Sequence, residues 1–243
     1  MSYVLIVGAT SDIARATAGL YAEHGYDLYL AARDVGNLKE FARNVTVKTQ
    51  RKVETVELDI LDYNSHQTFY NQLQEKPLGV ISFVGYLGSQ EKARTDFTEA
   101  KRIMETNYTG VVSLFNIIAR DFVQKKSGFM IGVSSAAGDR GRGSNFIYGS
   151  AKAALTTYLS GLRQSLADAH VHVMTVKPGF VATRMTAAMN LPQMLTAKPE
   201  SVAVDIYNAQ QNNRNIIYTK WIWRWIMMVI KVIPEGLFKR MNM

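Results

Sequence analysis

Seven short, mostly apolar runs recur along the chain, and longer segments with helical periodicity separate them. The runs cover residues 3–8, 27–32, 53–58, 78–84, 129–134, 171–176 and 215–218. The helical patterns start near residue 13 and then lie at 35–49, 63–73, 99–125 and 146–167. Strands that are apolar throughout are buried on both faces, which is typical of parallel sheets with helical crossovers. The chain is therefore predicted to form a parallel sheet with helices on both faces.

This arrangement is a doubly wound, Rossmann-like α/β fold of about seven strands, in which ligands bind outside the carboxyl ends of the strands. The chain has 243 residues, of which 47% are hydrophobic, enough for one sizeable core. We predict a single domain over 1–243, in which residues 220–243 form a hydrophobic and basic tail with an amphipathic helix.

Charge and composition narrow the classes of partner. The formal net charge of +8 suits an anionic partner, such as a phosphorylated cofactor, a phosphate-bearing substrate, an anionic membrane face or nucleic acid. No zinc-finger spacing and no aromatic–basic RNA-binding pattern occurs, so we expect no nucleic-acid partner. There is no cysteine, and His170 and His172 have no evident third ligand, so we predict no metal site. The first residues lack the charged lead of a signal peptide, which predicts a cytoplasmic location.

The turn after the first strand reads GATSDIA over residues 8–14. A glycine turn that leads into a helix is where a dinucleotide pyrophosphate would lie on the helix N-terminus. Asp12 and Ala14 stand where glycines are usual, so an ordinary capped turn remains an alternative. If phosphate binds here, the Asp12 carboxylate must point away from it.

Two charged residues follow the next two strands. Arg33 ends the second strand, at the position where an arginine accommodates the 2′-phosphate of NADP and a carboxylate would bind the ribose of NAD. Arg33 therefore favours NADPH over NADH, although a solvated arginine would look the same. Asp59, after the third strand, is placed to reach an adenine edge or to cap the next helix.

The segment 134–152 carries the candidate acid–base chemistry. Two serines, Ser134 and Ser135, end the fifth strand, and a helical pattern then places Tyr148 and Lys152 four residues apart. Residues at this spacing share a helix face, and a neighbouring cation lowers the pKa of a phenol. Such a pair could exchange a proton with a carbonyl or alcohol oxygen. Taken alone, the pair is no more than chance spacing predicts.

Taken together, these motifs resemble the short-chain dehydrogenase/reductase family over nearly the whole chain. The matching positions are 8–13, Asp59, Asn107, Ser135, Tyr148, Lys152 and 178–183. Their order and spacing carry the resemblance. It implies an oxidoreductase that uses NADPH to reduce a ketone to an alcohol, with a small-molecule carbonyl substrate.

The resemblance also implies roles for single residues. Tyr148 would donate a proton to the substrate carbonyl, and Lys152 would lower the pKa of Tyr148 and hold the nicotinamide ribose. Ser135, preferred over Ser134, would hydrogen-bond the carbonyl oxygen, and Asn107 would order a water between Lys152 and solvent. The implied cofactor-binding residues are Gly8, Thr10, Ser11, Ile13, Arg33, Asp59, Ile60, Gly85, Pro178, Gly179, Val181 and Thr183. Of these, Ile13 would flank the nicotinamide, and Val181 and Thr183 would hold its carboxamide.

The chain departs from the family pattern after the fourth strand, where Asn-Asn-Ala-Gly is usual and residues 82–85 read SFVG. Only Gly85 is kept. A non-catalytic NADP(H)-binding regulator on the same scaffold is the main alternative, and a membrane-docked adaptor is another. The intact Ser135, Tyr148 and Lys152 argue against the regulator, and the adaptor would predict lipid binding without turnover.

The tail contains three tryptophans and several basic residues between 220 and 240, in a run too short and too charged to span a bilayer. It could lie in a membrane interface or pack on the domain or a second subunit. The tail and the first turn loosely resemble family members that reduce polyprenyl-phosphate-linked keto-sugars, the decaprenylphosphoryl-2-keto-ribose reductases. This predicts a lipid-linked substrate and a place at the inner membrane face. The family habit also implies a homodimer or homotetramer through 99–125 and 146–167.

Overall fold

The computed structural model describes residues 2–187 and 189–241. Its main element is a parallel sheet of seven strands in the order β3-β2-β1-β4-β5-β6-β9, which confirms the predicted doubly wound fold. The strands are β1 (Tyr3–Val7), β2 (Asp27–Ala32), β3 (Val53–Glu57), β4 (Gly79–Ser82), β5 (Gly128–Val133), β6 (Val171–Pro178) and β9 (Ile216–Thr219).

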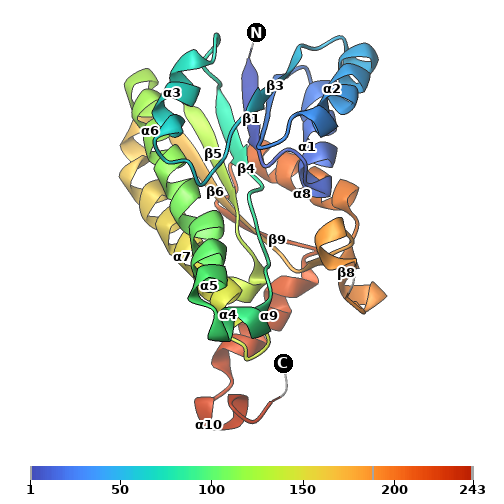
Figure 1. Cartoon of the computed structure of the whole chain (residues 1–243), viewed down its shortest axis with the longest axis vertical. Coiled ribbons are helices and arrows are strands. Elements are labelled where there is room, and N and C mark those ends of the chain that lie inside the picture. Colours follow the sequence, from blue (N-terminus) through green and yellow to red (C-terminus); the bar gives the residue numbers. More distant parts are fainter. Residues whose placement is uncertain (1, 188, 242–243) are drawn as a thin grey trace.

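Helices cover both faces of this sheet (Figure 1). One face carries α1 (Asp12–Glu23), α2 (Gly36–Thr49) and α8 (Pro199–Gln211), and the other carries α3 (Ser65–Gln72), α6 (Gly110–Lys125) and α7 (Phe146–Ser165). Each face has its own apolar core, because every strand sends alternate side chains to opposite sides. The order reverses between β1 and β4, the position at which such sheets bind ligands outside the strand ends.

Smaller elements gather at the carboxyl ends of the strands, in the lower part of Figure 1. They are α4 (Gln90–Thr95), α5 (Phe97–Met104), the two-stranded sheet of β7 (Phe180–Val181) and β8 (Thr196–Ala197), α9 (Ile222–Val232) and α10 (Glu235–Phe238). Short 3₁₀ turns lie at Ala136–Gly138, Ala167–Ala169, Arg184–Thr186 and Gln193–Leu195. Apart from Ala167–Ala169, which precedes β6 at the opposite edge of the sheet, these elements surround the edge where a ligand would bind.

The helical pattern at 99–125 is two α-helices joined by a π-helical turn, Glu105–Thr109, which contains Asn107. The extra residue in a π-turn turns the following side chains relative to a regular helix, and such turns are frequent at functional sites. The helix α8 and the β7–β8 pair had no counterpart in the sequence prediction. Asp59 does not cap the next helix: its carboxylate accepts a hydrogen bond from the Leu61 N–H within a turn, 3.0 Å away, and α3 begins only at Ser65.

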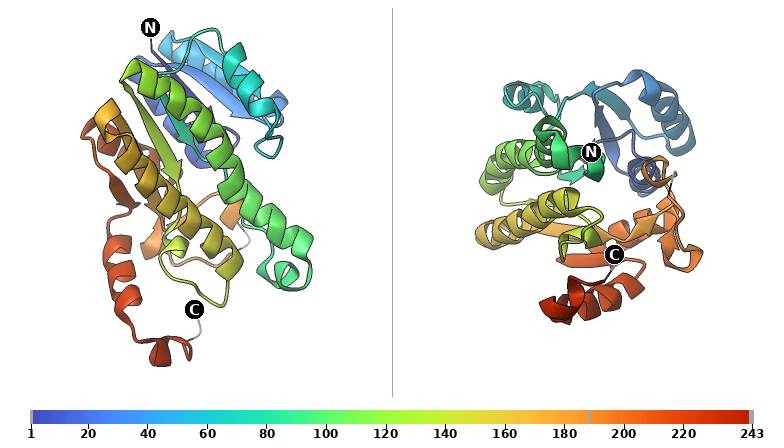
Figure 2. Two further views of the ribbon diagram at one scale, coloured as in Figure 1. Left: turned by 90° about the vertical axis from the view of Figure 1, so that its left-hand side faces the viewer. Right: turned by 60° about the horizontal axis from the view of Figure 1, so that its bottom comes forward.

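The tail packs on the carboxyl end of the sheet with one face of α9. Trp223 and Met227 are buried there, and the Trp223 indole N–H donates to the Leu195 carbonyl at 3.0 Å. Arg140 holds the far end of α9, because its guanidinium donates to the Ile230 and Ile233 carbonyls at 2.6 Å each. Figure 2 shows α9 and α10 extending beyond the rest of the molecule. No helix of residues 2–187 and 189–241 is long and apolar enough to cross a membrane.

Candidate active site

A pocket of about 480 Å³ lies at the carboxyl ends of the strands and extends across the point where the strand order reverses. All twelve residues predicted to bind the cofactor line it, and so do Ser135, Tyr148 and Lys152. Segments far apart in the sequence supply these residues, because the carboxyl ends of parallel strands all reach the same edge of the sheet. Asn107 is fully buried behind the wall of the pocket.

The turn after β1 requires glycine at position 8. The backbone φ of Gly8 is +77°, and a Cβ there would lie 3.0 Å from the backbone carbon of Phe83 and the backbone nitrogen of Val84. Both the backbone angle and the close approach to the end of β4 exclude a side chain. The turn leads directly into α1, whose N-cap residue Ser11 makes no side-chain capping hydrogen bond. The first N–H groups of α1 therefore remain available at the edge of the pocket.

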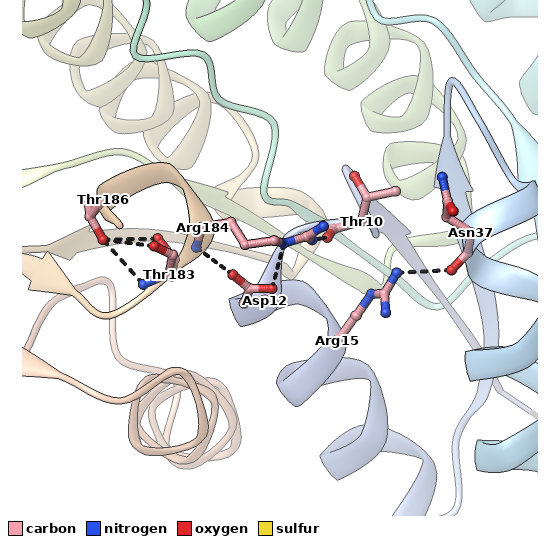
Figure 3. Close-up of polar contacts among 7 residues, drawn as sticks. All are labelled: Thr10, Asp12, Arg15, Asn37, Thr183, Arg184 and Thr186. Atoms are coloured by element: carbon pink, nitrogen blue, oxygen red, sulfur yellow. Dashed lines mark hydrogen bonds and ion pairs between the residues drawn. The ribbon is translucent and has the colours of Figure 1, made fainter. Parts of the chain in front are cut away.

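Asp12 and Arg184 join the first turn to the segment after β6 (Figure 3). The Asp12 carboxylate accepts from the Arg184 backbone N–H at 2.8 Å and from its Nε at 3.0 Å. The same guanidinium donates to the Thr10 carbonyl. The acidic residue that replaces a usual glycine is thereby neutralised by a cation from a segment some 170 residues away.

Ser135 and Tyr148 meet where the loop after β5 packs against α7. A Cβ at Gly138 would lie 2.7 Å from the Ala153 nitrogen, so this glycine lets the loop lie directly on the helix. The Ser135 hydroxyl accepts from the Ala137 N–H at 3.1 Å and lies near enough to the Tyr148 phenol to lower its pKa. Ser134, by contrast, is bonded to the Lys152 carbonyl and the Thr156 hydroxyl, each at 2.8 Å. The geometry supports Ser135 as the serine that faces a substrate.

Lys152 lies one helical turn after Tyr148, with its ammonium 5.8 Å from the centre of the Tyr148 ring. The ammonium donates to the carbonyls of Val133 at 3.0 Å and Val84 at 3.3 Å. Burial lowers the pKa of Lys152 from its ordinary value to about 7.

Burial also raises the pKa of Tyr148 to about 12, against a smaller lowering by the Ser135 hydrogen bond. The lowering of the Tyr148 pKa by Lys152 therefore stays a prediction from the family resemblance, while burial has the larger effect on the phenol in this structure. Burial is the largest cause of the pKa shift in both groups, because it disfavours the charged form of each. Tyr148 is thus a phenol that keeps its proton at neutral pH.

Asn107 connects the π-helical turn to the strand end beside Lys152. Its amide donates to the Tyr86 carbonyl at 2.7 Å and the Ile103 carbonyl at 2.8 Å, and accepts from the Tyr86 N–H at 3.2 Å. A Cβ at Gly85 would lie 3.5 Å from the Asn107 oxygen and 3.7 Å from the Lys152 ammonium. The glycine kept from the family pattern therefore lies between these two side chains.

Arg33 and Asp59 lie at the opposite end of the pocket from Tyr148 along the sheet order. Arg33 is exposed and makes no hydrogen bond or ion pair with any described residue. Four residues later, the Asn37 backbone carbonyl accepts a hydrogen bond at 2.9 Å from the Arg15 guanidinium of α1 (Figure 3). Arg33 is therefore free to meet an anionic group that enters this end.

Comparison with known proteins agrees with this geometry. A family model described as short chain dehydrogenase matches residues 2–193. An uncharacterised oxidoreductase of Mycobacterium tuberculosis is 34% identical over 98% of this chain and 96% of its own length. The chain belongs to the short-chain dehydrogenase/reductase family. As a member of this family it is an oxidoreductase.

More distant similarities agree with the fold. The NADP-dependent 3-hydroxy acid dehydrogenase of Schizosaccharomyces pombe is 28% identical and aligns with 75% of this chain and 73% of its own length. A short-chain dehydrogenase from Sphingobium yanoikuyae, solved in complex with NADPH, superposes with a TM-score of 0.84 at 21% identity, covering 100% of this chain and 97% of that one.

Several pocket residues of this short-chain dehydrogenase/reductase were not among the predicted site residues. They are Arg142 and Asn145 before α7, Arg184 and Met185 after β7, and Trp223 of α9. A Cβ at Gly179 would lie 2.0 Å from the Trp223 indole, so the tail forms part of the pocket wall through this glycine. The signal for Arg142 was present in the sequence as the Asp-Arg-Gly-Arg-Gly loop, 139–143, beside Ser135.

Proposed function

We propose that this protein uses NADPH to reduce a ketone to an alcohol. The observation that carries the proposal is the meeting of Ser135, Tyr148 and Lys152 in a pocket whose other end holds the Gly8 turn and Arg33. The pocket fits a dinucleotide because the Gly8 turn has no room for a side chain and the α1 N-terminus has no side-chain cap. An intact acid–base set also argues against a regulator that binds cofactor without turnover.

Each residue of the site has its own part in the proposed reaction. The nicotinamide, when bound, supplies the hydride. Ser135 holds the substrate carbonyl oxygen, and Tyr148 donates the proton that turns this oxygen into a hydroxyl. Lys152 holds the nicotinamide ribose beside Tyr148, and Asn107 keeps the strand end around Gly85 in place. Ile13, Val181 and Thr183 flank the nicotinamide, while Thr10, Ser11, Ile60, Pro178 and Gly179 form the remaining walls.

The test is NADPH oxidation by the pure protein with two sets of carbonyl compounds, one of soluble ketones and one of polyprenyl-phosphate-linked keto-sugars. Turnover of either set supports the reductase, provided that Tyr148→Phe lowers it by at least about 10²-fold. Bound NADPH without turnover of any compound would favour the regulator instead.

Arg33 is proposed to select NADPH over NADH through the 2′-phosphate. Similar structures are described with NADPH, with a 5-hydroxy-NADP and with NAD, so the fold accepts either cofactor. Arg33→Ala should weaken NADPH binding roughly 10- to 100-fold, the value of a hydrogen bond to a charged group, and leave NADH binding unchanged. Fluorescence titration of both cofactors measures this. Equal losses for the two would contradict the assignment.

The outer face of α9 supports contact with an anionic membrane. Trp221, Trp225, Met228, Val229 and Val232 are exposed along it at helical spacing, while the opposite face of α9 packs on the domain. The tail also carries five basic residues, Lys220, Arg224, Lys231, Lys239 and Arg240. Tryptophan beside exposed aliphatic and basic side chains suits the headgroup region of an anionic bilayer. We therefore propose a location at the inner membrane face and, with it, a lipid-linked keto-sugar as substrate.

A double variant, Trp225→Ser with Val229→Ser, should weaken binding to anionic vesicles about 30-fold, because each exposed side chain contributes on the order of 1 kcal/mol on leaving water. Co-sedimentation with anionic and with neutral vesicles measures this. The control is Phe97→Ser, which removes a side chain of 72% exposure from α5. If the wild-type protein does not bind anionic vesicles, this result contradicts the proposal. If the α9 face instead joins two copies, the variant will lower the mass of the proposed homodimer or homotetramer.

A further inference from the structure

Arg142 lies in the pocket wall beside Tyr148 and Ser135, and the reaction proposed above gives it no role. Its Nε is buried and has no hydrogen-bond partner, and no carboxylate among the described residues pairs with its guanidinium. Burial lowers the pKa of Arg142, with no opposing charge nearby. Arg142 as a whole is half-buried, and even partial burial of a cation without a partner costs free energy that arginine cannot relieve by losing its proton at neutral pH.

Two other arginines near this part of the pocket, Arg140 and Arg184, are satisfied within the chain. Arg140, two residues earlier, donates to two carbonyls of the α9 end, pairs with Glu235 at 2.9 Å and lies over the Phe238 ring. Arg184 pairs with Asp12. Arg142 differs from both, so it is the cation at this end of the pocket that a ligand can use.

A second unpartnered group lies on the same turn. The Asn145 N–H donates to the Arg142 carbonyl at 3.1 Å, and the Asn145 side-chain oxygen is buried without a hydrogen-bond partner. Both side chains line the pocket next to Tyr148. Buried polar groups in native proteins nearly always have partners, so two exceptions on one turn indicate a polar ligand.

The charged side chains that line the pocket differ in their partners and in the end of the pocket at which they lie. Asp12 is neutralised by Arg184, and Asp59 and Arg33 lie at the end assigned to the adenosine half of the cofactor. Lys152 is bonded to two carbonyls of the strand ends. At the Tyr148 end this leaves Arg142 without an opposing charge. An arginine fork matches the oxygens of a carboxylate or phosphate.

We propose that Arg142 binds an anionic group of the substrate, a carboxylate or a phosphate, while the carbonyl to be reduced lies at Tyr148 and Ser135. Asn145 binds a neighbouring polar group of the same molecule. This inference rests on the proposed reductase function and narrows its substrates to anionic ketones.

The experiment compares matched pairs of ketones that differ in charge: levulinate with its methyl ester, and dihydroxyacetone phosphate with dihydroxyacetone. Wild-type enzyme should prefer the anionic member of at least one pair, and the pair identifies carboxylate or phosphate. Arg142→Gln should reduce this preference, measured as the ratio of kcat/KM values, by about 10- to 100-fold, mainly through KM. Arg142→Lys should restore part of it. Arg120→Gln, at an exposed position of α6, is the matched control and should keep the wild-type ratio.

Two measurements separate this inference from the reductase proposal. Thermal unfolding with NADP⁺ present should show that levulinate or dihydroxyacetone phosphate stabilises the wild type and not Arg142→Gln, whether or not turnover occurs. Without ligand, Arg142→Gln should be as stable as wild type or more so. If Arg142 instead stabilised the fold, its replacement would lower the melting temperature. Turnover with a preference for the neutral members would overturn the anion site and leave the reductase standing. Anion binding without turnover of any ketone would support the anion site and contradict the reductase proposal.

Discussion

Replacing Tyr148 by phenylalanine should lower kcat for ketone reduction by about 10²- to 10⁴-fold, the range of general acid catalysis. The substitution removes the proton donor and keeps the ring. Because burial holds the pKa of Tyr148 near 12, the phenol carries its proton throughout the neutral range and nothing else at this position can donate. The dissociation constant for NADPH, measured by fluorescence, should change by less than about threefold, a small free-energy difference.

The same helix offers a matched control for this variant. Tyr158 lies on α7 outside the pocket, and its hydroxyl donates to the Asn116 side chain at 2.8 Å. Tyr158→Phe removes the same atom and should keep wild-type kcat. Retained turnover in Tyr148→Phe would exclude this phenol as the donor. Loss of NADPH binding in the same variant would instead show that the phenyl ring cannot keep the pocket intact.

Replacing Lys152 by methionine should lower turnover by at least about 10²-fold and should also change how stability depends on pH. Burial lowers the pKa of Lys152 from 10.5 to about 7, so between these values the unfolded chain binds a proton that the folded chain does not. Unfolding free energy then rises with pH in this window by on the order of 1 kcal/mol per unit. Below a pH of about 7, Lys152 is charged in both the folded and the unfolded chain, so folding carries the full free-energy cost of burying this charge.

Wild-type protein should therefore gain stability relative to Lys152→Met as the pH rises from neutral toward the ordinary lysine value. Chemical denaturation of both proteins at several pH values measures the difference. Lys39→Met, at an exposed position of α2, removes the same charge and should show the same pH dependence of the unfolding free energy as the wild type. A constant difference between wild type and Lys152→Met would show that Lys152 keeps its ordinary pKa in the folded protein.

Much of the site followed from local patterns. Tyr148 and Lys152 were expected side by side because a helix repeats every 3.6 residues, and they lie on one turn of α7. Gly8 was expected in a tight turn, and its φ of +77° shows why no other residue suits it. The predicted cofactor residues line one pocket because each follows a strand of a parallel sheet. Their roles toward the cofactor, and the single-domain organisation, remain predictions.

Other features depended on contacts between distant segments. The pairing of Asp12 with Arg184 has no signature in residue spacing. Neither has the buried, unpartnered Nε of Arg142. The same is true of the pKa values, since the burial of Tyr148 and Lys152 depends on the surrounding segments. The same holds for the loop 139–143, in which Asp139 is held by Lys177 and Tyr218, and Arg140 by the tail.

The sequence by itself determined the seven-stranded parallel sheet, the edge where ligands bind and the residues that meet there. It could do so because the apolar run of each strand and the periodicity of each helix are local patterns in the sequence. Tertiary structure decided which face of α9 is buried, which arginines already have partners and which groups lose their water. These depend on the packing of segments that are far apart in sequence, and the free energy of a charge depends on everything within a few ångströms of it.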